Sequence, residues 1–140
     1  MALELTNVAL QTVAAAANVT FAETPVRDCR GQIVHREGSG IVTLRGAPNG
    51  ARYKVSFGGN IAVTEGGTPG PISLALAIDG EALGSTTMTV TPTVAEAFFN
   101  VYGAVFVVVP CSCCVTISVR NTTAAAIDVT NANLIVERVA

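Results

Sequence analysis

The stretch FFNVYGAVFVVV, residues 98–109, decides the fold class of this chain. Successive side chains of a β-strand point to opposite faces of the sheet, and here both faces are apolar. One face carries Phe98, Tyr102, Ala104, Phe106 and Val108, and the other carries Phe99, Val101, Gly103, Val105, Val107 and Val109. An antiparallel strand in a small domain usually leaves one face in water. We therefore expect a second sheet to cover one face and another subunit to cover the other.

The composition supports the same expectation. The chain has 140 residues, which suffice for one domain with a substantial core. Half of the residues are hydrophobic and 13% are charged, against roughly 25% charged residues in a typical soluble domain. This shortage of charge indicates that much of the surface is buried in an oligomer.

The charge and hydropathy patterns argue against several classes of function. The net charge is −2, and the eight Lys and Arg residues are scattered along the chain, so a nucleic-acid interface has no electrostatic footprint. No apolar run reaches the roughly 18 residues that span a bilayer. The N-terminal segment lacks the basic residues and the long apolar run of a secretory signal. We expect no nucleic-acid or membrane partner, and a product that stays where it is made or leaves inside a larger particle.

Short strands separated by turn residues follow one another along the chain. Turns are predicted at residues 46–50 (GAPNG) and at Asp79-Gly80. Strands are predicted at residues 18–24, 33–37, 40–45, 51–63, 72–78, 85–91, 97–109, 113–120, 127–129 and 133–139. About ten short strands with regular turn signals and no long helix are typical of an all-β sandwich.

Residues 1–17 stand apart from the predicted domain, which comprises residues 18–140. Their spacing fits strand pairs, whereas the four alanines at positions 14–17 favour a helix. The segment is either an apolar arm that anchors the protein to a neighbour or an extra edge strand of the domain itself. The candidate anchor residues are Leu3, Leu5, Val8, Leu10 and Val13.

The residues that carry chemistry in enzymes are sparse. His35 is the single histidine, and an exposed strand histidine is a better interpretation than a catalytic base. The cluster Cys111, Cys113 and Cys114 is a poor metal site because neighbouring residues of a strand point to opposite faces. A pairing of Cys29 with Cys111 or Cys114 stays open under oxidising conditions, although small buried or half-buried side chains are favoured. We expect no enzyme activity, no metal and no cofactor.

The order of these strands resembles the jelly roll of the tumour-necrosis-factor and complement-collagen-domain superfamily, in particular its bacterial and phage branch. The segments that carry the resemblance are residues 50–63, 71–80 and 134–139. The resemblance implies an all-β, two-sheet antiparallel jelly roll of about ten strands. It also implies a homotrimer in which the outer face of one sheet surrounds a three-fold axis. The trimer-interface residues expected on this basis are Phe99, Tyr102, Phe106, Val108, Leu134 and Val136.

The resemblance further implies a structural role rather than a chemical one. The chain has no Gly-X-Y run of a collagen-like stalk, and its arrangement is similar to that of free-standing trimeric proteins on phage heads. We expect a virion protein that assembles in the host cytoplasm and decorates the capsid by binding the major capsid protein or another head protein. The alternative is a receptor- or glycan-binding head domain of a fibre or surface protein, which would place aromatic residues at loop tips. The loops GAPNG, EGGTPGP and NTTAAA contain none.

Overall fold

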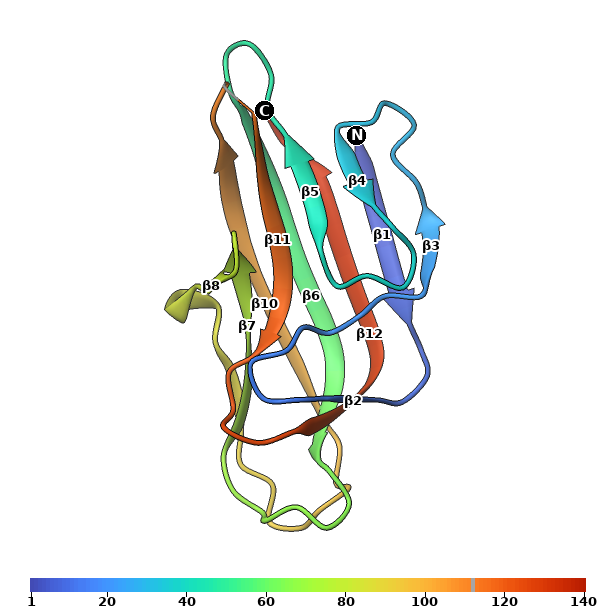
Figure 1. Ribbon diagram of the computed structural model, residues 1–140, viewed down its shortest axis with the longest axis vertical. Coiled ribbons are helices and arrows are strands. Elements are labelled where there is room, and N and C mark those ends of the chain that lie inside the picture. The colour runs from blue at the N-terminus through green and yellow to red at the C-terminus, as the bar shows by residue number, and fades with distance from the viewer. Residues whose placement is uncertain (112) are drawn as a thin grey trace.

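The computed structural model describes residues 1–111 and 113–140 as a sandwich of two six-stranded antiparallel sheets (Figure 1). Sheet A has the strand order β10-β6-β12-β1-β3, with β2 also paired to β12. Its strands are β1 (Ala2–Asn7), β2 (Gln11–Val13), β3 (Glu23–Val26), β6 (Ala51–Val63), β10 (Phe99–Val109) and β12 (Ile127–Arg138). Both termini lie at the same end of the sandwich, the upper end in Figure 1. The predicted all-β, two-sheet jelly roll is confirmed.

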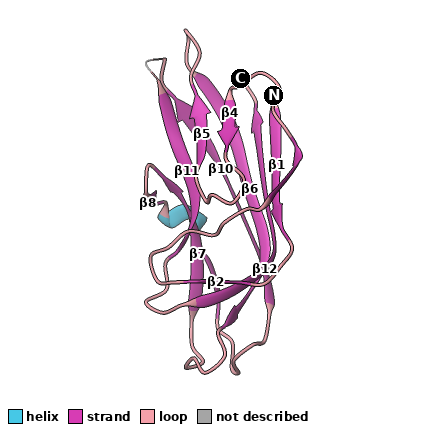
Figure 2. Cartoon of the chain, turned by 45° about the vertical axis from the view of Figure 1, so that its right-hand side comes forward, coloured by secondary structure: helices cyan, strands magenta, loops and turns pink. Residues whose placement is uncertain are grey.

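Sheet B has the strand order β4-β5-β11-β7-β8, with β9 also paired to β7. Its strands are β4 (Ile33–His35), β5 (Val42–Arg45), β7 (Ile72–Ile78), β8 (Glu81–Ala82), β9 (Met88–Val90) and β11 (Cys114–Asn121). A single turn of 3-10 helix, Gly84–Thr86, stands where a Thr-rich strand was expected to begin, and Figure 2 shows it beside β8. Asp79 and Gly80 both have positive φ, as a type I′ turn requires, and they form the predicted hairpin turn.

The two longest strands form the centre of sheet A. In β6 the inward residues Tyr53, Val55 and Phe57 are buried, as the alternating pattern predicts. Strand β12 pairs with β6 along most of its length, although two shorter strands were expected there. The register shifts between Thr130 and Asn133. A bulge of this kind adds a residue without ending the strand, which explains why the gap in the pattern does not interrupt β12.

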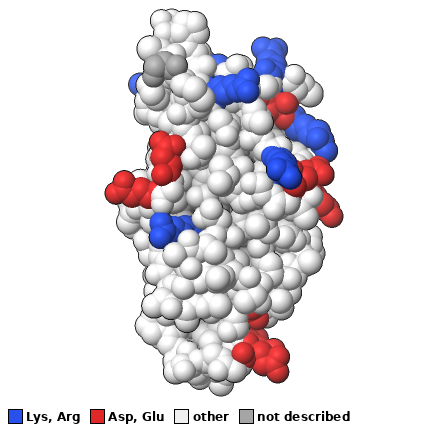
Figure 3. All heavy atoms as spheres, in the orientation of Figure 1, with Lys and Arg blue, Asp and Glu red and all other residues white. Residues whose placement is uncertain are grey.

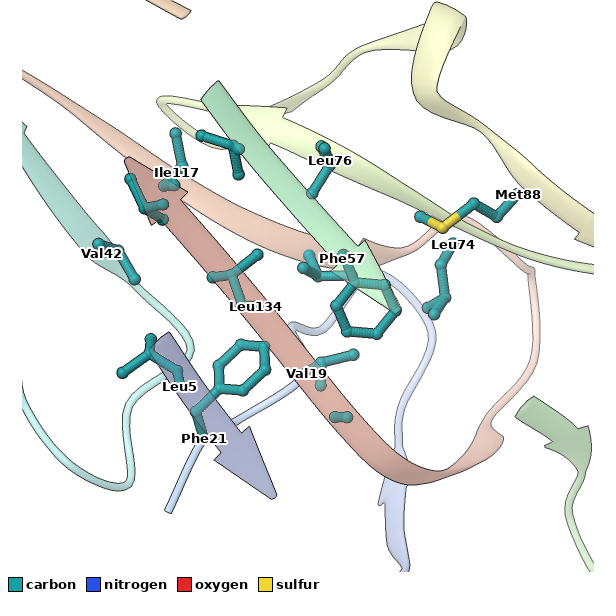
Figure 4. Close-up of a cluster of buried hydrophobic side chains, with 14 of the residues drawn as sticks. Leu5, Val19, Phe21, Val42, Phe57, Leu74, Leu76, Met88, Ile117 and Leu134 are labelled. Carbon is teal, nitrogen blue, oxygen red and sulfur yellow. The ribbon is translucent and has the colours of Figure 1, made fainter. Parts of the chain in front are cut away.

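The core lies between the sheets and takes side chains from both (Figure 4). Phe21 and Phe57 are fully buried and meet edge to face, with ring centroids 6.4 Å apart and an interplanar angle of 72°. Such aromatic pairs add about 0.5–1.5 kcal/mol beyond the area that they bury. Tyr53 is also fully buried, and its hydroxyl donates a 2.6 Å hydrogen bond to the carbonyl oxygen of Arg45. The core therefore accommodates the Tyr53 hydroxyl without leaving it unpaired.

The N-terminal segment belongs to the sandwich, so of the two alternatives for residues 1–17 the structure has a strand of the domain and not a separate arm, although β1 is not at the sheet edge. Strand β1 lies inside sheet A, between β12 and β3, and is paired to both. Leu3 and Leu5 point into the core and expose 4% and 0% of their surface. The strand-like spacing of the apolar residues thus predicted the structure of this segment correctly, and the alanine run did not. The alanines at positions 14–17 form no helix, because the chain turns there with positive φ at Ala16.

Strand β10 lies at the edge of sheet A, paired to β6. One further expectation needs correction. Residues 18–24 were expected to form a strand that ends at Pro25, whereas β3 runs from Glu23 to Val26 and contains this proline. Proline lacks the N–H that a central strand needs and is tolerated at a sheet edge, where β3 lies.

Candidate functional site

The most unusual surface of the protein is the outer face of sheet A, along strand β10. Tyr102, Phe106 and Val108 expose 66%, 65% and 66% of their surface on this face, and Ala104 between them is also exposed. We call these four residues the β10 ridge. The alternate residues Val101, Val107 and Val109 are buried in the core. Both faces of the strand are thus apolar, as its sequence indicates, but only one of them is covered within a protomer.

Beside the ridge runs a strip of small residues on β6. The antiparallel register places Gly58 opposite Tyr102 and Ser56 opposite Ala104. On the far side of Ser56, strand β12 presents Ile135, which is 40% exposed. We call Ser56 and Gly58 the β6 trough, because larger side chains flank them on both sides. A row of large apolar residues next to a row of small ones gives this face the relief of a packing surface.

Polar side chains border the apolar part of the face at its lower end. The Asn100 amide donates to the Asn60 side-chain oxygen over 3.1 Å, and the Asn60 amide in turn donates to Asn131 over 3.4 Å. On the neighbouring strands, the Asn133 amide donates to a Glu4 carboxylate oxygen over 2.9 Å. The first two bonds join Asn100, Asn60 and Asn131 in one layer across the sheet, whereas Asn133 lies level with Gly58 and Tyr102. The apolar ridge therefore begins abruptly at Tyr102.

Lys54, Arg52 and Glu137 lie at the opposite end of this face from Asn60 and Asn100. The register aligns Lys54 with Phe106 on one side and with Glu137 on the other, and Arg52 with Val108. Within the described part of the chain the one salt bridge is Arg27–Glu37, elsewhere on the surface. Figure 3 shows the same scarcity on the face that it displays, where large areas carry no charged side chain. An exposed pair such as Arg27–Glu37 adds little stability.

The structure separates the six residues predicted for the trimer interface. Tyr102, Phe106 and Val108 lie on the β10 ridge, and Phe99 is 44% exposed at the lower end of the same strand. Leu134 and Val136 are fully buried in the core, so they cannot contact another subunit. The outward residues of β12 are the alternate ones, including Ile135. Because residues 134–136 are all aliphatic, the sequence does not indicate which of them face inward.

The five predicted anchor residues are likewise divided. Leu3, Leu5 and Val13 are buried between the sheets, which removes them from any contact with another protein. Val8 and Leu10 expose 66% and 57% of their surface in the turn between β1 and β2. Only this turn retains the exposed apolar character that an anchor requires.

The cysteines differ from every pairing that was considered. Cys113 and Cys114 are joined to each other by a disulfide, and Cys29 and Cys111 are free and exposed. The structure contains neither pairing of Cys29 that was left open, and all four cysteines are exposed, where buried or half-buried side chains were expected. Ser112, within the cysteine cluster, lies outside the described residues. In the described chain no three His, Cys, Asp or Glu side chains converge to hold a metal ion.

The remaining polar groups have structural roles. His35 is half-buried rather than exposed, and its Nε2 lies 2.8 Å from the carbonyl oxygen of Ser39, to which it must donate. The Asp28 carboxylate accepts hydrogen bonds from the backbone N–H groups of Arg30, Gln32 and Ile33. Partial burial would raise the pKa of Asp28, but these bonds outweigh it and hold the pKa below its usual value. Burial raises the pKa of Tyr53.

The comparisons with known proteins identify the fold. The sequence matches no protein-family model, and no curated protein matches it significantly. The structure is similar to Eiger TNF from S. frugiperda, with a TM-score of 0.71 and 13% identity over 100% of this chain and 92% of that one. The globular domain of zebrafish complement 1qA gives a TM-score of 0.63 and 13% identity, with 94% of each chain covered.

A third similar structure is the PRD1 vertex protein P5, with a TM-score of 0.51 and 16% identity over 99% of this chain and 96% of that one. No helix among the described residues is long and apolar enough to cross a membrane. At these identities the likeness concerns the fold alone. The chain therefore has the jelly-roll fold of TNF- and C1q-like domains.

Proposed function

We propose that this protein is a non-enzymatic structural protein of a phage head, a homotrimer that decorates the capsid. The observation that carries the proposal is the β10 ridge, a row of apolar side chains left in water on the outer face of an edge strand. The rings of Tyr102 and Phe106 alone expose on the order of 250 Å², given the usual size of aromatic side chains. A contiguous apolar strip of this kind marks an interaction site.

A cyclic assembly explains why a single ridge suffices. In a ring, each subunit offers one patch to the next subunit and receives the previous subunit on another. The ridge and the rest of the outer face of sheet A are two different patches on one surface, as such a ring requires. The expectation of three subunits comes from the resemblance to the tumour-necrosis-factor superfamily, and the jelly-roll fold supports it.

The place on a virion is the finer part of the proposal. One protein of similar fold is a phage vertex protein, and the low charge of this chain suits a surface that is mostly covered by subunits and shell. The proposed partner is the major capsid protein or another head protein. Since β1 is part of sheet A, we assign the contact with the shell to the turn that presents Val8 and Leu10.

Light scattering at micromolar concentration tests the assembly. A homotrimer has three times the 14.3 kDa mass of the chain, whereas a 14.3 kDa particle would contradict the proposal. Antibodies against the recombinant protein should then label intact purified virions of the phage that encodes it, and an absence of label would remove the head assignment.

The variant Val8→Ser/Leu10→Ser tests the shell contact separately. Because both residues are exposed, the variant should remain a trimer and should occupy fewer sites on capsids that lack the wild-type protein. The matched control is Ile41→Ser, which changes an apolar residue of similar exposure elsewhere on the surface. Equal occupancy by the two variants would show that the turn is not the anchor.

A further inference from the structure

Neither the backbone conformation nor the core packing of the protomer requires glycine at position 58, in the middle of β6. The φ of Gly58 is not positive, so its backbone conformation is open to any residue. A Cβ atom at this position would have no neighbour closer than 3.9 Å, which is ordinary van der Waals contact. Glycine inside a strand destabilises it by roughly 0.5–1 kcal/mol relative to alanine. The residue is therefore tolerated at a cost that the isolated protomer does not explain.

Two glycines nearby are explained by packing inside the protomer. A Cβ at Gly59 would lie 3.1 Å from the ring of Phe57, and a Cβ at Gly103 would lie 3.2 Å from the sulfur of Met88. Both positions face the core, where no space is left. Gly58 faces outward, and its pairing with Asn133 is regular because the bulge of β12 lies beyond that pair. The contrast isolates Gly58 as the exception.

We infer that Gly58 and Ser56 form the seat for the β10 ridge of a neighbouring copy of the chain. Glycine within a strand often marks a place where another chain approaches closely, and the β6 trough lies on the same face as the unpartnered ridge. The ridge offers large apolar side chains, and the trough offers the small ones between which they fit. This inference rests on the proposed homotrimer and assigns its contact: the ridge of each copy meets the trough of the next.

The borders of the trough determine how the neighbouring ridge is placed along it. The asparagine layer of Asn60 and Asn100 closes the lower end, and the charged side chain of Lys54 closes the upper end. An aromatic ring that slid past either end would bury amides or an ammonium group without partners, which is costly. The apolar seat is thus only two residues long on β6, and one register of the two copies is favoured.

The variant Gly58→Val tests this assignment. Valine favours strands and would fill the seat from outside the core. Sedimentation equilibrium should show that the concentration at which half of the trimers dissociate is at least about tenfold higher for Gly58→Val than for the wild type. The reason is that overpacking at each contact costs a few kcal/mol. The control is Thr43→Val on β5, which adds valine to a half-buried position of sheet B and should leave dissociation unchanged.

The possible outcomes distinguish a failure of the proposed trimer from a failure of the proposed seat alone. A monomeric wild-type protein would overturn the trimer and the seat together. A trimeric wild type whose dissociation is unaffected by Gly58→Val would overturn the seat alone. If Gly58→Val does not fold, Gly58→Ala replaces it, with the same direction expected and a smaller effect.

A further measurement tests a purely internal role, in which Gly58 makes room for Tyr102 of its own chain, whose ring would lie 3.9 Å from a Cβ at position 58. At a concentration at which Phe106→Ser is monomeric, adding Gly58→Ala should give a midpoint of urea unfolding equal to or higher than that of Phe106→Ser alone. A clearly lower midpoint, or failure of both Gly58 variants to fold, would mean that the glycine serves its own protomer and would overturn the inference.

Discussion

Replacing Phe106 by serine tests the proposed assembly most directly, because we expect it to leave the stability of the protomer almost unchanged and to weaken the trimer strongly. Phe106 exposes 65% of its surface in the protomer. Surface substitutions usually change the free energy of unfolding by no more than about 0.5 kcal/mol. The folded protomer should therefore tolerate Phe106→Ser, with an unchanged far-UV circular dichroism spectrum.

The effect on the trimer follows from the area that a neighbour would cover. A phenylalanine side chain offers about 200 Å², so the exposed part of Phe106 corresponds to roughly 130 Å² of apolar surface. At about 25 cal/mol per Å² this is worth ~3 kcal/mol per protomer, and ~10 kcal/mol for three. Each 1.4 kcal/mol is a factor of ten in an equilibrium constant, and the dissociation constant of a trimer scales as concentration squared. The half-dissociation concentration should rise several thousandfold, since half of about seven decades is about three and a half.

Sedimentation equilibrium over a wide concentration range measures this shift. Ile41→Ser is the control, because Ile41 is 49% exposed and lies just before β5, away from sheet A. It should leave the half-dissociation concentration where it is in the wild type. The reasoning would be refuted if Phe106→Ser formed trimers as tightly as Ile41→Ser, since the ridge would then contribute nothing to association.

Two further predictions concern the protomer itself. Leu5→Ala should lower the free energy of unfolding by about 3–5 kcal/mol in urea titrations, because it opens a cavity beneath β1; a loss below 1 kcal/mol would show that β1 does not belong to the core. Asp28 has a pKa below its usual value of 3.8, so it contributes stability above that pH, and this contribution is lost as the pH falls through the lowered pKa. The acid limb of the stability curve should therefore be shallower in Asp28→Asn, and an identical acid limb would exclude this role.

Local sequence patterns predicted several elements of the fold accurately. Strands β6 and β7 begin and end where the alternation of residues 51–63 and 72–78 places them. The Asp79-Gly80 turn was also predicted, since few residue pairs adopt positive φ at two successive positions. These features depend on neighbouring residues, so they are visible in a single sequence.

The candidate site was only partly predictable. The two apolar faces of residues 98–109 indicated that one of them would meet another molecule, and the structure leaves Tyr102, Phe106 and Val108 exposed. Ile135 and the trough residues Ser56 and Gly58 were missed. An outward-facing glycine at position 58 of an otherwise regular strand was the signal that could have identified the trough.

Short β-strands with more apolar surface than one sandwich needs follow from composition and from the period of the side chains, so a single sequence predicts them. The contacts between strands are needed to show that Leu134 and Val136, rather than Ile135, face the core, and that β1 pairs within sheet A instead of extending as an arm. A strand with apolar residues on both faces can be placed either way round. Its orientation is set by the strands that it pairs with, which are distant in sequence.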